Sequence, residues 1–245
     1  MKRYYFILSM ALIALCLTGC AMISYSPGQN SSLTGIGEPE VYTFQVGEFK
    51  EVYLEIFCVT YYYAAPSDVI TLEIQPNLLE YISVEESGDL LSIRSIKNIN
   101  WSNYAPILTI STPFLSSLTI DGAGDFIARA PIKGESFTFK VKGAGSGRAE
   151  LDVENLTVLL SGFGSLELFG RADKANFTMD GLGNIEALSL QTRESSINSS
   201  SACNITISCS EKLTVNAEGI GSVEYRGSPI LNLNNDGLIS VEKVD

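Results

Sequence analysis

Four glutamates occur in two pairs whose spacing could place their carboxylates side by side. Glu167 and Glu186 are 19 residues apart, and Glu224 and Glu242 are 18 residues apart. If these segments stack as neighbouring strands about 4.8 Å apart, each pair approaches the roughly 5 Å carboxylate separation of a retaining glycosidase. Carboxylate oxygens at that distance could also bind a divalent cation such as calcium.

The rest of the sequence argues against catalysis by these residues. The chain contains no histidine, which removes the usual general base and every Ser-His or Cys-His arrangement. Nothing in the sequence builds a pocket around the glutamates, and a solvated charged face explains the column without a ligand. We therefore expect no catalytic residues and no cofactor, and at most a weak cation column made by Glu167, Glu186, Glu224 and Glu242.

Glycine pairs define the repeat in which the glutamates lie. The motifs DGAGDF, KGAGSG, SGFGSL, DGLGNI and EGIGSV place their first glycine at positions 122, 143, 162, 181 and 219, and Gly237 continues the series. The steps are 21, 19, 19, 38 and 18 residues, so the longest step spans two periods, with Ser199 to Ser201 in place of the glycine turn. The segments between glycines alternate apolar and polar residues and keep no helical period. A fixed period near 19 residues predicts an all-β solenoid.

Apolar residues occupy fixed places around each first glycine. Residues two, four and six places before it are mostly apolar, for example Phe137, Phe139 and Val141, and are predicted to point inward. A second inward column, four places after the glycine, contains Phe126, Leu166, Ile185, Cys203, Val223 and Val241. The next residues form an outward column in which Asn204 follows Glu186. The glycines predict corners, where positive φ or close contact between rungs excludes a β-carbon.

Aromatic residues gather before the glycine repeats. In VYLEIFCVTYYYAAPSD, Tyr53, Phe57, Tyr61 and Tyr63 alternate with apolar positions, and Trp101 and Tyr104 follow in NINWSNYAP. Exposed rings can stack on sugars or grip peptide, so the candidate ligand surface comprises Tyr53, Tyr61, Tyr63, Trp101 and Tyr104. A strand buried on both faces, or one that caps the solenoid, would give the same pattern.

The first residues indicate export and lipidation. Lys2 and Arg3 precede an apolar run that is too short for a stable membrane span, and the run ends in LTGC. This tetrapeptide resembles the lipobox of bacterial lipoproteins, in which Cys20 becomes the lipidated first residue. We therefore predict a lipoprotein signal peptide over 1–19, lipidated Cys20 and a flexible tether over 20–40, and a single solenoid domain over 41–245. An ordinary signal peptide with an incidental cysteine is the alternative.

Charge and cysteine content restrict the partners. The formal charge of −12 makes nucleic acid and anionic lipid surfaces poor partners. A disulfide between Cys203 and Cys209 is one possibility, but extended chain would separate their Cα atoms by about 20 Å, which favours buried thiols. The absence of histidine and of any Cys-x-x-Cys pair argues against zinc.

Rungs such as LTIDGAGDF, FTMDGLGNIEAL and LTVNAEGIGSVEY resemble the family described as "putative auto-transporter adhesin, head GIN domain". The resemblance covers roughly residues 41–244. It implies a right-handed parallel β-helix-like fold with a β-rich N-terminal part, and it supplies no catalytic residues.

Functions from different classes stay open at this point. The sequence favours a non-catalytic binding or adhesion module for glycan or protein, held on the membrane of a bacterial cell envelope by lipid at Cys20. The alternatives are a structural envelope protein without a specific ligand and, as a third reading, a β-helix enzyme that acts on polysaccharide. Ala21 and Met22 lack the aspartate associated with inner-membrane retention, which favours the outer membrane of a Gram-negative cell.

Overall fold

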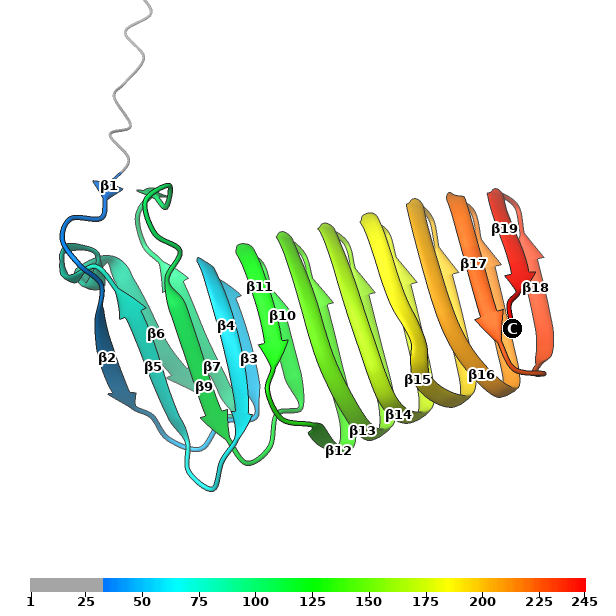
Figure 1. The fold of residues 1–245 in the computed structure, drawn as a ribbon, viewed down its shortest axis with the longest axis horizontal. Helices are drawn as coiled ribbons and strands as arrows, with labels where there is room; N and C mark the ends of the chain where they lie inside the picture. Colours follow the sequence, from blue (N-terminus) through cyan, green and yellow to red (C-terminus); the bar gives the residue numbers. More distant parts are fainter. Residues whose placement is uncertain (1–32) are drawn as a thin grey trace, which may run out of the picture. The chain divides into compact units, whose positions relative to one another are not determined.

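The computed structural model describes residues 33–245, which form a β-solenoid of about 7 turns with rungs of roughly 19 residues (Figure 1). This confirms the all-β solenoid predicted from the glycine period. The elements are β1 Leu33–Thr34, β2 Glu40–Gln45, β3 Glu51–Glu55, β4 Phe57–Ala64, β5 Val69–Ile74, the 3-10 helix η1 Pro76–Tyr81, β6 Ile82–Ser87, β7 Leu90–Ser95, β8 Ile99–Asn100, β9 Ile107–Thr112, β10 Ser117–Ile120, β11 Ala123–Ala128, β12 Ile132–Val141, β13 Ala144–Leu160, β14 Phe163–Met179, β15 Leu182–Ser199, β16 Ala202–Ala217, β17 Ile220–Arg226, β18 Ile230–Asn235 and β19 Leu238–Lys243.

Each rung contributes to two opposed faces of the solenoid. The first face carries residues that follow a glycine corner, and the second face carries residues that precede the next one. β13 and β14 run through both faces and pair in parallel from Ala144 with Phe163 to Leu160 with Met179. Earlier and later rungs split into two strands, such as β11 and β12 or β17 and β18 (Figure 1).

The glycine corners form because neighbouring rungs approach each other closely. A β-carbon built on Gly181 would lie 2.0 Å from the carbonyl oxygen of Gly162 in the preceding rung. The second glycine of a pair can also need a special backbone, since Gly124 has a φ of 141°, a conformation that other residues rarely adopt. Both reasons predicted for the corners are therefore confirmed.

The core lies between the two faces. The side chains of Phe126, Phe137, Phe139 and Phe177 are all 0% exposed. Phe126 from the first face meets Phe139 from the second face edge to face, with ring centroids 5.6 Å apart, a favoured aromatic geometry. The predicted inward columns are therefore confirmed where the glycine pairs mark the register.

The rung without a glycine pair departs from the predicted register. Ile205, rather than Cys203, is in register with Ile185, and Thr206, rather than Asn204, is in register with Glu186. The physical reason is that Ser201 occupies the corner, since its carbonyl oxygen faces Gly219. The alignment of Cys203 and Asn204 was therefore wrong by two residues, although Cys203 is buried.

The N-terminal part closes the solenoid with antiparallel strands. β2 pairs with β5, β5 with β9, and β6 with β7, all antiparallel, while β3 and β4 pair in parallel with β10 and β11 of the first glycine-marked rung. Helix η1 links β5 to β6 and buries Leu78.

Contacts with the folded domain begin before the predicted domain boundary. β1 pairs with β8, and Asn77 donates from Nδ2 to the Thr34 carbonyl and accepts from the Ile36 amide. Residues 33–40, predicted as tether, are therefore held against the solenoid by hydrogen bonds. The predicted signal peptide, Cys20 and residues 21–32 lie outside the described residues.

The described cysteines carry free thiols. Cys58, Cys203 and Cys209 are unbonded and buried, as favoured from the sequence. No helix within residues 33–245 is long and apolar enough to cross a membrane.

Candidate functional site

The glutamate column lies on the outward side of the first face. Glu167 is in register with Glu186 across β14 and β15, and Glu224 is in register with Glu242 across β17 and β19. Thr206 stands between the two pairs in the same column. The structure therefore places the four glutamates in two pairs rather than in one continuous ladder.

Arg148 neutralises part of the first pair. Its Nε atom lies 2.9 Å from Glu167 Oε2, and the two side chains are 60% and 52% exposed. Within residues 33–245, no group of three or more His, Cys, Asp or Glu side chains is arranged to hold a metal ion. A cation bound by Glu167 and Glu186 would have to compete with the guanidinium, so calcium binding stays a prediction without a preformed site.

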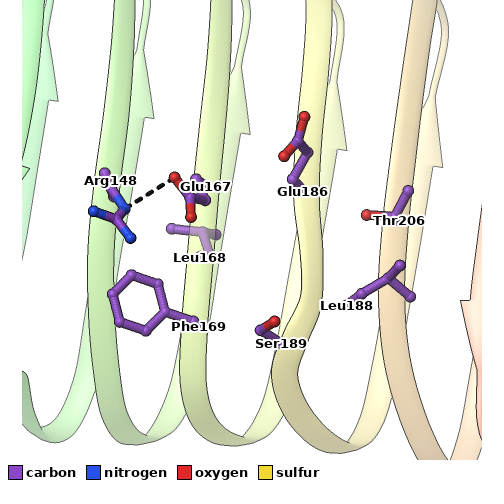
Figure 2. Close-up of a pocket in the computed structure, with 8 residues that line it drawn as sticks. All are labelled: Arg148, Glu167, Leu168, Phe169, Glu186, Leu188, Ser189 and Thr206. Carbon is purple, nitrogen blue, oxygen red and sulfur yellow. Dashed lines mark ion pairs between the residues drawn. The ribbon is translucent and has the colours of Figure 1, made fainter.

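A groove opens beside this ion pair (Figure 2). It has a volume of about 510 Å³. Figure 2 shows the Phe169 ring next to the Arg148 guanidinium, and the guanidinium carbon lies 5.4 Å from the ring centroid, within cation–π range. We call it the Phe169 groove, and its lining residues are Arg148, Glu167, Leu168, Phe169, Glu186, Leu188, Ser189 and Thr206.

The groove exists because β15 carries extra residues. Between Glu186 and Leu190 this strand has one residue more than β14 has between Glu167 and Gly170. Strand β16, the next in the stack, has no residues to match this stretch of β15. Ala187 and Gln191 of β15 are in register with Ile207 and Ser208 of β16, which are consecutive. A bulge of this kind re-aims side chains and commonly lies next to functional sites; here it moves Leu188 and Ser189 to the groove wall.

A second hollow continues the groove along the first face. It has a volume of about 410 Å³, shares Arg148, Glu167 and Glu186 with the Phe169 groove, and adds Ser146 and Ser165. Ser146 and Ser165 belong to a column of polar residues in register, which continues through Asn184, Asn204 and Ser222. In this column Asn204 Nδ2 donates to Asn184 Oδ1 at 3.1 Å, and Ser222 Oγ donates to Asn204 Oδ1 at 2.9 Å. The first face therefore presents a continuous row of hydrogen-bonding groups.

The structure does not bring the predicted aromatic ligand surface together. The chain turns at Ile56, the position in register with corner residue Gly122. Tyr53 therefore lies on the second face in β3, whereas Tyr61 and Tyr63 lie on the first face in β4. None of these three tyrosines is fully buried, but the corner at Ile56 places Tyr53 on a different face from Tyr61 and Tyr63.

Most of these rings already have partners within the chain. The Tyr53 hydroxyl donates to Asp121 Oδ2 at 2.6 Å, and this bond, together with weaker effects of burial and acidic charge, raises the pKa of Tyr53 to about 12. The Arg94 guanidinium covers the same ring. Arg129 lies 4.8 Å from the Tyr61 ring centroid.

The remaining two aromatic residues are also engaged. Trp101 stacks on Phe57, with centroids 6.4 Å apart, and Tyr104 donates a hydrogen bond to Glu73. Burial, followed by this bond, raises the pKa of Tyr104 to about 12. Tyr63, 44% exposed, is the most accessible of the five residues, so the surface offers less free aromatic area than the sequence suggested.

Sequence reasoning identified Glu167 and Glu186 but missed Phe169, Leu188 and Ser189 of the groove. The signal lay in the 38-residue step between Gly181 and Gly219. The step is as long as two average rungs, so its length did not show that the first rung, which ends at Ser201, is longer than average and that the second is shorter.

Known proteins resemble this chain in sequence pattern and in fold. The model of the family described as "Putative auto-transporter adhesin, head GIN domain" matches residues 48–229. A crystal structure of a putative adhesin from Bacteroides fragilis has a TM-score of 0.82 and 23% identity, and the alignment covers 87% of this chain and 100% of that chain. No curated protein matches the sequence.

Two Parabacteroides structures share the fold at lower similarity. One, from Parabacteroides distasonis and named as a putative lipid binding protein, has a TM-score of 0.65 and 22% identity, with 87% and 100% of the two chains covered. A putative adhesin from Parabacteroides merdae has a TM-score of 0.60 and 17% identity, with 87% and 99% covered. At these identities the likeness concerns the fold alone. Because the family model spans most of the sequence, the chain belongs to the family described as "Putative auto-transporter adhesin, head GIN domain".

Proposed function

We propose that this protein is an adhesion module of the bacterial cell envelope, anchored by lipid at Cys20, and that it binds glycan in the Phe169 groove. The observation that carries the proposal is the meeting of a half-buried aromatic ring with hydroxyl, carboxylate and guanidinium groups in one hollow (Figure 2). The family description and the adhesin names of the similar structures support a non-enzymatic adhesive role.

The chemistry of the groove suits a sugar. Arg148 lies against the Phe169 ring, and the part of the ring that lines the groove can pack against the apolar face of a pyranose. Glu186, Ser189 and Thr206 line the same groove as hydrogen-bonding groups. A site with an apolar floor and a few placed polar groups is the usual form of a small-molecule pocket. The adjoining hollow lengthens the groove across neighbouring rungs, as a chain of several sugars would require.

Binding suits the glutamates better than hydrolysis does. A glycosidase needs its two carboxyl groups placed on opposite sides of the scissile bond, one of them as a proton donor. Glu167 is instead held in an ion pair with Arg148, and Glu167 and Glu186 are in register on neighbouring strands of the same face. We therefore assign them to orientation of the bound sugar.

A glycan array probed with the protein tests the proposal, with two single variants. Phe169→Ala should lower affinity for any bound glycan about tenfold, which corresponds to about 1.4 kcal/mol, because the stacking surface is lost. Tyr63→Ala removes an exposed aromatic outside the groove and should leave affinity unchanged.

Three other results would point to a different binding site or to a different function. If Tyr63→Ala abolishes binding and Phe169→Ala does not, the ligand binds at the aromatic residues of β4. Absence of binding to every glycan supports a protein ligand or a structural role. Release of new reducing ends would establish hydrolysis and overturn the non-catalytic assignment.

A further inference from the structure

Within residues 33–245, the rung that contains β18 and β19 presents two strand edges without a neighbouring strand. Among the described residues, β18 pairs only with β16 and β19 only with β17, so the outer side of each strand is open (Figure 1). The Asp236 amide, just after β18, donates to Ala217 of β16. Because backbone groups alternate along a strand, the amides and carbonyls of Leu231 and Leu233 point to the open edge.

The core is uncovered at the same end. Leu231 and Leu233 continue the inward column of Leu213 and Val215, with which they are in register. The two residues in β16 are 0% exposed, whereas Leu231 and Leu233 are 37% and 49% exposed. Leu231 and Leu233, whose counterparts in β16 are core residues, are therefore exposed to solvent between the two edge strands.

Strand β18 lacks the usual protection against pairing, whereas β19 carries Glu242 and Lys243 at its end. Exposed edge strands in natural proteins carry charges, prolines or covering segments, but β18 has the sequence ILNLNN, with none of the charged residues and no proline. Asn234 is also in register with Asn216, whose side-chain amide donates to Asn198 at 2.8 Å. The asparagine row therefore reaches the edge as well.

The opposite end of the solenoid is protected. Its outer strands β2 and β6 carry Glu40, Glu85 and Glu86, and η1 crosses between β5 and β6 with Leu78 buried beneath it. A second copy that stacked its open end on this protected end would meet acidic side chains and a covering segment. The contrast argues against head-to-tail polymers.

A suitable partner must cover two edges and the core between them. A single extended peptide could pair with one strand and would leave the other strand and the leucines exposed. The same end of a second copy supplies two edge strands at the required separation of about 10 Å, with apolar side chains between them. We propose that two copies of this protein associate through β18 and β19 at their open ends to form a closed dimer.

Symmetry makes the contact self-complementary. A two-fold axis perpendicular to the solenoid axis reverses the strand direction, so the edges of the two copies meet as antiparallel strands. Such an interface uses the same patch on both copies and closes after two. The absence of charge from β18 matters because the chain has a formal charge of −12, which elsewhere would oppose contact between two copies. This association is independent of glycan binding at the Phe169 groove.

Native mass spectrometry of the full processed protein in mild detergent, over a range of protein concentrations, tests the proposal. We expect a monomer–dimer equilibrium without higher oligomers. Hydrogen exchange should show protection of residues 230–243 that grows with concentration, while exchange of β2 and β6 stays constant.

Two variants and one control locate the interface. Leu233→Lys places a charge in the apolar contact and should raise the dimer dissociation constant at least about tenfold. Leu231→Pro removes one amide that points to the edge and should weaken the dimer without loss of the pairing with β16. Phe114→Lys makes the same kind of change at an apolar residue that is 62% exposed elsewhere, and it should leave the dimer intact.

The proposal fails on any of three results. The first is a protein that stays monomeric at every concentration, and the second is the formation of oligomers larger than a dimer. The third is a dimer that persists in folded Leu233→Lys and Leu231→Pro variants and does not slow hydrogen exchange in β18 and β19. Thermal melting of each variant establishes that it is folded, so a loss of association cannot be confused with a loss of structure.

Discussion

Arg148 Nε lies 2.9 Å from Glu167 Oε2, and Glu167 is in register with Glu186 in the next rung. Two carboxylates stacked at rung distance repel by about 1 kcal/mol in water-like surroundings. The arginine offsets that repulsion from the other side of Glu167, and the same guanidinium packs against Phe169. One residue therefore links the charge balance of the column to the groove.

Arg148→Gln should expose this repulsion. We expect the free energy of unfolding to fall by less than about 1 kcal/mol, as is usual for exposed ion pairs, and millimolar calcium to restore part of the loss by bridging Glu167 and Glu186. Melting temperature with and without calcium measures both effects. Wild-type protein should show no calcium shift.

Arg171→Gln is the matched control for this prediction. It breaks an ion pair of similar geometry, with Arg171 Nη2 2.8 Å from Asp152 Oδ1, but leaves the Glu167–Glu186 pair intact. Calcium should not rescue it. A calcium shift in wild-type protein that disappears in the Glu167→Gln, Glu186→Gln double variant would show that the column binds the ion despite Arg148.

Gly181→Val tests the corner. The added β-carbon would lie 2.0 Å from the Gly162 carbonyl oxygen, a backbone atom, so neighbouring rungs must separate. We expect a loss of about 1–3 kcal/mol of stability, measured by thermal or denaturant unfolding. Gly47→Val is the control, because the nearest atom there is the movable Glu86 carboxylate; equal losses in the two variants would contradict the corner assignment.

The sequence predicted the solenoid well because every rung needs the same kinds of residue at the same spacing. Each rung must bury alternate residues and pass close to its neighbour at the corner, so residues such as Phe177 and Gly181 recur in kind at a fixed spacing. A single ambiguous rung does not disturb that period. Fold class, inward columns and corners could therefore be predicted without coordinates.

Features that occur once could not be predicted. The corner at Ile56 carries no glycine, so nothing marked the turn that separates Tyr53 from Tyr61. The long rung around Ser189 and the shorter one that follows sum to two periods, which concealed the bulge that forms the groove. The bare Leu233 has the pattern of a core residue, and its exposure depends on which strands lie beside it.

Cys20→Ala tests the lipid anchor. Without the thiol, no acyl chains can be attached at this position, and the stable membrane association that two or more chains provide is lost. We expect the folded domain to move to the soluble fraction, or the uncleaved precursor to accumulate. Membrane fractionation and metabolic labelling with palmitate measure this, and unchanged labelling of the variant would disprove lipidation at Cys20.

The buried thiol of Cys58 should make the stability of the protein depend on alkaline pH. Burial raises the pKa of Cys58 from 9.0 to about 11, with a smaller opposite effect from its contact with Thr60. Below pH 9 the thiol is protonated in both the folded and the unfolded chain. Between about pH 9 and pH 11 the unfolded chain loses a proton that the folded chain keeps, so stability falls with pH, by up to about 1.4 kcal/mol per unit.

Cys58→Ala removes this contribution. The variant should be less stable than wild type at pH 8, because a small cavity replaces the sulfur, but the difference should narrow as the pH rises to 10.5. Tyr53 and Tyr104, whose pKa values are also raised, stay in both proteins and cancel in the comparison. Denaturant unfolding at the two pH values measures the difference, and a gap that stays constant or widens would show that Cys58 ionises in the folded state as readily as in the unfolded chain.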